Sequence, residues 1–267
     1  MEWRDDGIVL SIKAHGETSV LIDLFTSERG RHSGLVRGGK SRKIRPILQV
    51  GNVVSATWRA RLDEHLGSAT VEMVEPVASR LFDDPLALAG LSSLCSLLSL
   101  FPERAPHQGL YKGAKLVLSH MEDEQIWPGL LVRFEMEVLS ELGFRLDFSE
   151  CAATGLKEEL VYVSPKSGRA VSRGAGLPYK EKLLELPPFL RGETEEGVSD
   201  QDILNGFALT GFFFERYIFR PDQQAGFSTG NFKNNNKGTD HFGVPRCEAS
   251  RSSFLKRYKK IRTPENI

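Results

Sequence analysis

Residues 34–41, GLVRGGKS, match the phosphate-loop pattern G-x-x-x-x-G-K-[ST] at every defined position. In a phosphate loop, backbone N–H groups surround the phosphates, the lysine reaches the outer phosphates, and the Ser or Thr hydroxyl binds Mg²⁺. Lys40 and Ser41 would take these two roles in a nucleotide hydrolase. Such a loop must also open a helix, because the helix N-terminus faces the bound anion.

The residues around this stretch argue against a hydrolase. Pro46 follows Ser41 closely, and a proline inside a helix breaks or kinks it. The aspartate that binds Mg²⁺ should end a hydrophobic strand downstream of the loop, but the best such strand ends at Asp23, upstream. No H-E-x-x-H pattern occurs elsewhere. We therefore expect a protein that is not an enzyme and keep the hydrolase as an alternative.

Length and composition predict an ordinary globular protein. The chain has 267 residues, of which 40% are hydrophobic and 26% are charged. No run of about 18 apolar residues occurs, and the first residues lack the pattern of a signal peptide. The three cysteines lie far apart, which is typical of free thiols in a reducing compartment. We expect a cytoplasmic protein without a membrane span and without a cofactor.

Charge is distributed unevenly along the chain, although the formal net charge is zero. Residues 29–62 contain nine lysines or arginines and no aspartate or glutamate. Such a basic segment favours a polyanionic partner such as a nucleic acid, whereas a flexible, solvated hairpin is the alternative. The candidate nucleic-acid contacts are Arg31, Arg37, Lys40, Arg42, Lys43, Arg45, Arg59 and Arg61.

Residues 1–80 predict a small β-barrel domain. Apolar and polar residues alternate with period two in the segment 52–62, which is the pattern of a strand with one buried face. Five such strands separated by turns are typical of the OB-fold, a barrel that commonly binds oligonucleotides. The loop that carries Arg37, Lys40, Arg42, Lys43 and Arg45, called the basic loop below, would join the third strand to the fourth. It would lie beside Arg59 and Arg61. The expected strands are 7–13, 19–26, 31–36, 52–62 and 66–77.

The pattern becomes helical after the barrel. We expect a helical domain over residues 81–221 that includes an irregular insertion at 147–198. After Pro221, a segment rich in Gly and Asn is followed by a basic end, which predicts a disordered basic tail over 222–267. The expected helices are 85–101, 109–121, 128–144 and 199–219.

This order of segments resembles the RecO family of bacterial recombination mediators. The resemblance covers about residues 1–220 and is carried by GIVLSIKAHGETSVLIDLFTSERGRHSGLVRGGKSR, LVRFEMEVLSELGFRLDFSECAATG and YVSPKSGRAVS. It implies an α+β protein in which an N-terminal five-stranded OB-fold barrel precedes a helical domain. It also implies a nucleoid-associated monomer that binds single- and double-stranded DNA and has no catalytic site.

The resemblance further implies what such a protein would do on DNA. It would anneal complementary single strands and act with RecR to load RecA onto DNA coated with single-strand DNA-binding protein (SSB). The acidic, apolar tail of SSB would dock on the helical domain, where Arg133 and Phe134 are the candidate contacts. An RNA-binding OB-fold protein is a further alternative, which a preference for structured RNA would favour.

The sequence departs from the family in the insertion. Many members of the family carry four cysteines there, which hold a zinc ion. Here only Cys151 is present, and Thr154, Ser172 and Ala175 stand at the other three positions. One thiolate cannot form a tetrahedral structural zinc site. We therefore expect a degenerate, zinc-free version of a zinc finger and no metal site.

Overall fold

The computed structural model describes residues 1–62, 65–193, 197–221 and 243–263. The chain separates into two compact units, Met1–Glu122 with Asp240–Arg257, and Asp123–Thr239 with Tyr258–Ile267. The predicted domain boundary at residue 80 coincides with the end of α1 (Val77–Arg80) and falls inside the first unit. In the part of the chain that is described, no helix is both long and apolar enough to cross a membrane.

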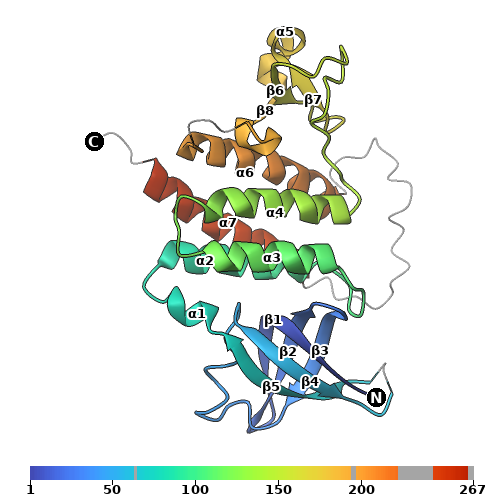
Figure 1. Cartoon of the computed structure of the whole chain (residues 1–267), viewed down its shortest axis with the longest axis vertical. Coiled ribbons are helices and arrows are strands. Elements are labelled where there is room, and N and C mark those ends of the chain that lie inside the picture. Colours follow the sequence, from blue (N-terminus) through green and yellow to red (C-terminus); the bar gives the residue numbers. More distant parts are fainter. Residues whose placement is uncertain (63–64, 194–196, 222–242, 264–267) are drawn as a thin grey trace. The chain divides into compact units, whose positions relative to one another are not determined.

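The first unit is built on a closed five-stranded barrel of the OB-fold type, as the sequence predicts (Figure 1). The strands follow one another around the barrel in the order β1-β2-β3-β5-β4, and only the β3–β5 pair is parallel. β1 pairs with β4 through its first half and with β2 through its second half. The strands are β1 (Glu2–His15), β2 (Ser19–Thr26), β3 (Gly30–Val36), β4 (Val53–Arg59) and β5 (Gly67–Glu75).

The barrel closes where Gly34 of β3 pairs with Gly67 of β5. A Cβ atom on Gly67 would lie 2.1 Å from the ring of Trp58, so no other residue fits there without moving the indole. That indole is held in place, because Trp3 stacks on it with ring centroids 5.5 Å apart. The two glycines thus allow the strands to approach a rigid aromatic core.

Two longer helices, α2 (Pro85–Leu98) and α3 (Gln108–His120), also belong to the first unit. Asp84 caps α2, since its Oδ1 accepts hydrogen bonds from two backbone N–H groups of the first turn at 2.9 Å. α2 is apolar on most sides and packs against β1 and α3. Leu91 of α2 covers Gly51, where a Cβ atom would lie 2.5 Å from the leucine side chain.

The second unit is centred on α4 (Trp127–Glu141) and α6 (Asp200–Phe214), which lie side by side (Figure 1). Gly206 lets α6 approach α4 closely, because a Cβ atom there would lie 2.9 Å from Val132. The buried Glu135 of α4 accepts a hydrogen bond from the Thr210 hydroxyl of α6. α6 then continues as a π-helical turn, η3 (Glu215–Phe219).

The insertion at 147–198 contains more regular structure than its sequence indicated. Three strands form a sheet in the order β7-β6-β8, and strands of two to four residues are too short to show a period. Its elements are β6 (Leu160–Val163), β7 (Ala170–Ser172), α5 (Arg173–Gly176), η1 (Leu177–Lys182), β8 (Leu184–Glu185) and η2 (Pro188–Arg191).

The predicted disordered tail over 222–267 is wrong for residues 243–263. Most of this segment is a 20-residue helix, α7 (Gly243–Arg262). Cys247, Arg251, Phe254 and Tyr258 are buried, and their spacing of four, three and four places them on one face of a helix. Residues 222–242 and 264–267, which the same prediction includes, lie outside the described residues.

Candidate nucleic-acid interface

The GLVRGGKS stretch leaves β3 and enters a loop that occupies residues 37–52. In this loop the chain forms successive turns, such as the one in which the Arg45 N–H donates to the Ser41 carbonyl at 2.9 Å. No helix follows Lys40 within residues 37–52, and β4 begins at Val53. The strand–loop–helix arrangement that a phosphate loop requires does not occur here.

Uncharged residues anchor the loop to the barrel. Leu48 is only 2% exposed and belongs to the hydrophobic core of the barrel. The buried side chain of Asn52 donates to the carbonyls of Pro46 and Ile47 at 3.1 and 3.2 Å. The same side chain accepts a hydrogen bond from the Ala78 N–H at 3.0 Å, which links the loop to the start of α1. The loop is therefore folded against the barrel and is not an open hairpin.

The cations of the loop are exposed and have no acidic partner among the described residues. Lys40 Nζ donates to the Gly16 carbonyl at 2.8 Å, which connects the loop to the turn between β1 and β2. The side chains of the other four form no hydrogen bond or ion pair with any described residue. Five cations without a counter-charge create a positive surface at this end of the barrel. They are Arg37, Lys40, Arg42, Lys43 and Arg45.

Arg31, a further predicted contact, lies at the other end of β3 and is engaged within the protein. Its Nε donates to both carboxylate oxygens of Asp23 at 2.9 and 3.1 Å. Its Nη1 donates to the carbonyls of Ser99 and Phe101 at 3.1 and 3.2 Å. Burial raises the pKa of Asp23 to about 6, although the Arg31 guanidinium acts in the opposite direction. Arg31 thus joins the barrel to the segment after α2.

Arg59 lies far from the end of the loop but nearer to its start, because Ser68 of β5 pairs with both Arg59 and Leu35 of β3. The expectation that Arg59 and Arg61 lie beside the loop stays a prediction. Arg59 is the last residue of β4, whereas the loop joins its first residue, Val53. A strand of seven residues separates its ends by about 20 Å at ~3.3 Å per residue. Arg59 also forms an exposed ion pair with Glu2 at 2.7 Å. The five loop cations share one loop, whereas Arg31 and Arg59 are engaged in ion pairs with Asp23 and Glu2.

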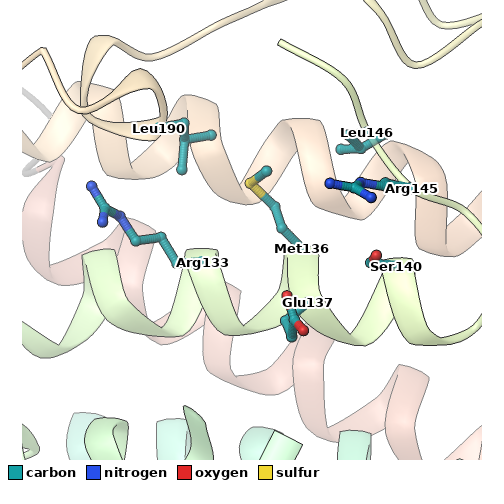
Figure 2. A pocket seen from close by; sticks show the side chains of 7 residues that line it. All are labelled: Arg133, Met136, Glu137, Ser140, Arg145, Leu146 and Leu190. Carbon is teal, nitrogen blue, oxygen red and sulfur yellow. The ribbon is translucent and has the colours of Figure 1, made fainter. Parts of the chain in front are cut away.

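A pocket on the second unit contains one of the two predicted partner contacts. Its cavity volume is about 220 Å³, and Arg133, Met136, Arg145 and Leu190 contribute to its lining. Figure 2 shows the two arginines on either side of Met136, with Leu190 close to it. Arg133 is positioned by its Nη2, which donates to the Phe189 carbonyl at 2.6 Å. The pocket thus combines two guanidinium groups and one carboxylate, that of Glu137, with apolar surface.

Phe134, the other predicted partner contact, does not line this pocket. Its side chain is only 3% exposed. Consecutive positions on a helix point about 100° apart, so Arg133 and Phe134 face different sides of α4. Met136 and Leu190 supply the apolar surface beside Arg133 instead. A contact between Phe134 and a partner is not compatible with this burial.

Cys151 lies in a tight turn in the insertion. Its carbonyl accepts from the Gly155 N–H at 2.8 Å, and its Sγ accepts from the Ser172 N–H at 3.2 Å. Burial raises the pKa of the Cys151 thiol, but hydrogen bonds from Ser172, Thr154 and the Ala153 N–H outweigh it and lower this pKa to about 6. Within the described ranges, no group of three or more His, Cys, Asp or Glu could hold a metal ion.

These features define an OB-fold protein with an exposed basic loop and an attached helical unit. Family comparison agrees with this class. The model of the N-terminal domain of recombination protein O matches residues 1–79, and the model of its C-terminal domain matches residues 83–224. The chain belongs to the RecO family of DNA repair proteins.

Curated relatives are similar over most of the chain. The DNA repair protein RecO of a strain of Methylorubrum extorquens is 52% identical over 229 residues, which are 84% of this chain and 93% of the relative. The RecO proteins of Mesorhizobium japonicum and Brucella abortus are 49% and 48% identical, over 85% and 84% of this chain and 92% and 91% of theirs. The family match ends at residue 224, before α7.

Proposed function

We propose that the protein is a recombination mediator that binds single-stranded DNA through the basic loop and anneals complementary strands. The observation that supports this most is the folded loop, whose five exposed cations have no acidic partner among the described residues. Contacts between such cations and phosphates give affinity without reading sequence. Annealing brings two polyanions together, so a surface that offsets their charge suits this activity.

We extend the proposal to the loading of RecA onto SSB-coated DNA in concert with RecR. Membership of the RecO family supports this step. The pocket on the second unit supports the contact with SSB, because an acidic, apolar peptide would find the Arg133 and Arg145 guanidinium groups beside Met136 and Leu190. The same loop cations would contact double-stranded DNA, whose phosphates carry the same charge.

The loop is tested by fluorescence anisotropy of a labelled single-stranded oligonucleotide in a salt titration. The variant changes Arg37, Arg42 and Lys43 to Gln and leaves Lys40, because Lys40 also binds the Gly16 carbonyl. We expect weaker binding and a salt slope that is flatter by about 2, since each phosphate contact on a single strand contributes ~0.7. A matched variant with Lys112, Lys157 and Lys182 changed to Gln carries the same net charge and should bind like the wild type.

The same titration separates the alternatives. Binding that is equal for the loop variant and the wild type would refute the assignment of the loop. Binding that requires ATP and Mg²⁺ would support the nucleotide hydrolase, and a clear preference for structured RNA would support the RNA-binding alternative.

The pocket is tested with a peptide that carries the acidic C-terminal sequence of the cognate SSB. Changing Arg145 to Gln should weaken the binding of this peptide about tenfold, the size of one charge-assisted hydrogen bond. Changing the exposed Lys166 to Gln in the same unit should have no effect. Equal weakening in both variants would indicate a general charge effect and contradict the pocket.

A further inference from the structure

A second pocket, called the hollow below, lies at the start of β3, whereas the basic loop follows the end of this strand. Its cavity volume is about 330 Å³, and its lining residues are Glu28, Arg29, His32, Arg104 and Pro106. Arg29 belongs to the turn between β2 and β3, and Arg104 belongs to the segment between α2 and α3. All of these residues are part of the first unit, so the hollow is a feature of the barrel and its attached segment.

The backbone holds Arg104 in a conformation that few residues adopt. Its φ is 64°, in the left-handed region that favours glycine. The Arg104 N–H donates to the Arg31 carbonyl at 2.8 Å, and a Cβ atom on Gly30 would lie 2.0 Å from the Ala105 carbonyl oxygen. The segment therefore lies directly against the start of β3. Strain of this kind persists where surrounding contacts impose it, and it is concentrated at functional sites.

The two arginines of the hollow are available for a ligand. The Arg29 and Arg104 side chains are exposed and form no hydrogen bond or ion pair with any described residue. The neighbouring acids already accept hydrogen bonds: Glu28 from Gln108 at 2.8 Å, and Glu103 from Ser33 at 2.6 Å. The hollow thus presents two guanidinium groups and one acid, Glu28, which reduces its positive charge.

We propose that this hollow binds a backbone phosphate of the single strand that the basic loop holds. The inference rests on the proposed function and assigns it a second contact. Two guanidinium groups suit a phosphate, because each can donate parallel, charge-assisted hydrogen bonds. The seven residues of β3 place this contact about 20 Å from the loop, at ~3.3 Å per residue.

The separation of the two contacts fits a single strand on one barrel. A stacked strand advances about 3.4 Å per nucleotide, so roughly six nucleotides span the distance between the loop and the hollow. OB-folds bind about 4–16 nucleotides each. An oligonucleotide of about four nucleotides should therefore occupy the loop alone, whereas one of about twelve should reach both contacts.

The experiment compares three variants by anisotropy with oligonucleotides of these two lengths. The double variant R29Q/R104G removes both guanidinium groups, and glycine suits the φ of residue 104, so its thermal midpoint should not fall. We expect roughly tenfold weaker binding of the longer oligonucleotide, as for the loss of a charge-assisted hydrogen bond, and unchanged binding of the shorter one. E28Q retains an acceptor for Gln108 but removes a negative charge, and it should bind the longer oligonucleotide more tightly. Lys112 is an exposed cation on α3, and the control variant K112Q should bind like the wild type.

The outcomes separate this inference from the proposed function. If the wild type binds no single-stranded DNA, the proposed function fails. If the wild type binds, but R29Q/R104G and E28Q bind the longer oligonucleotide as it does, the loop stands and the hollow is refuted. The NMR signals of the Arg29 and Arg104 side-chain N–H groups provide a second measurement on the unchanged protein. Shifts on adding the longer oligonucleotide support the inference, whereas shifts with inorganic phosphate alone would show a site for small anions and overturn it.

Discussion

Tyr258 of α7 provides a direct test of the helix that composition did not predict. Its side chain is 1% exposed, and its ring lies 5.8 Å from that of Phe207 on α6. Its hydroxyl donates to Asp200 Oδ1 at 3.3 Å. The residue thus combines an apolar contact with a polar one, and two substitutions separate them.

The expected losses differ in size. Y258F removes only the hydrogen bond, which at this length should lower the free energy of unfolding by about 1 kcal/mol. Y258A also removes the buried ring and leaves a cavity, so the loss should be about 3–5 kcal/mol, the range for large aromatic residues. The exposed Lys259 next to it is the control, and K259A should change the free energy of unfolding by less than about 0.5 kcal/mol.

Urea denaturation followed by circular dichroism gives the three free energies of unfolding, and amide hydrogen exchange reports protection in α7 itself. Similar losses for Y258A and K259A, with rapid exchange throughout 243–263, would contradict the packing of this helix. The sequence-based prediction of disorder would then be right for residues 243–263.

Two further predictions concern the barrel and the insertion. G67A should lower the free energy of unfolding by at least about 2 kcal/mol, because its Cβ would lie 2.1 Å from the Trp58 ring. Urea unfolding measures the loss, and G174A is the control, since nothing lies within 4 Å of a Cβ at that position. Equal losses in the two variants would contradict the tight closure of the barrel. In the insertion, S172A should raise the pKa of the Cys151 thiol from about 6 by removing a hydrogen bond to the sulfur. Since this pKa lies below the ordinary thiol value of 9.0, the thiolate contributes stability that is complete above pH 9.0 and is lost as the pH falls through about 6. Ultraviolet titration of the thiolate measures the shift, and identical titrations of variant and wild type would refute its cause.

The barrel was predictable because its strands carry a local signal. In β4, the alternation of Val54, Ala56 and Trp58 with polar residues reports a buried and an exposed face, and these three side chains are indeed buried. The turns between strands contain glycine and polar residues, which fix the number of strands. The position of the basic loop between the third and fourth strands follows from this count alone.

The pairing of the predicted cations was not predictable in the same way. Arg31 meets Asp23 because of the register between β2 and β3, in which Asp23 lies opposite Ser33 and Arg31 opposite Phe25. A register of this kind depends on the complete barrel and is not a property of either strand. The ion pair between Arg59 and Glu2 likewise follows from the register between β1 and β4, in which these two residues lie opposite each other.

Two predictions were wrong although the sequence carried a contrary signal: the partner contact of Phe134 and the disorder of residues 243–263. Phe134 and Val138 are both apolar and lie four residues apart, so they share one face of the helix. This spacing predicts that Phe134 is buried, as it is, and does not predict a partner contact. In α7, Arg251 occupies one position of the buried stripe, and it interrupts the apolar pattern of Cys247, Phe254 and Tyr258. Basic residues on the other faces lower the mean hydropathy of the segment and conceal a regular spacing.

The anchoring of the basic loop by Leu48 and Asn52 has a consequence for how the protein can change over evolutionary time. The residues that determine the path of the loop carry no charge, and the side chains of Arg42, Lys43 and Arg45 take no part in holding it. Substitutions at these three positions can therefore raise or lower attraction to a polyanion gradually, without a cost in folding. Function and stability trade against each other where one residue serves both. This loop keeps the two properties on separate residues, so that one can change and leave the other unchanged.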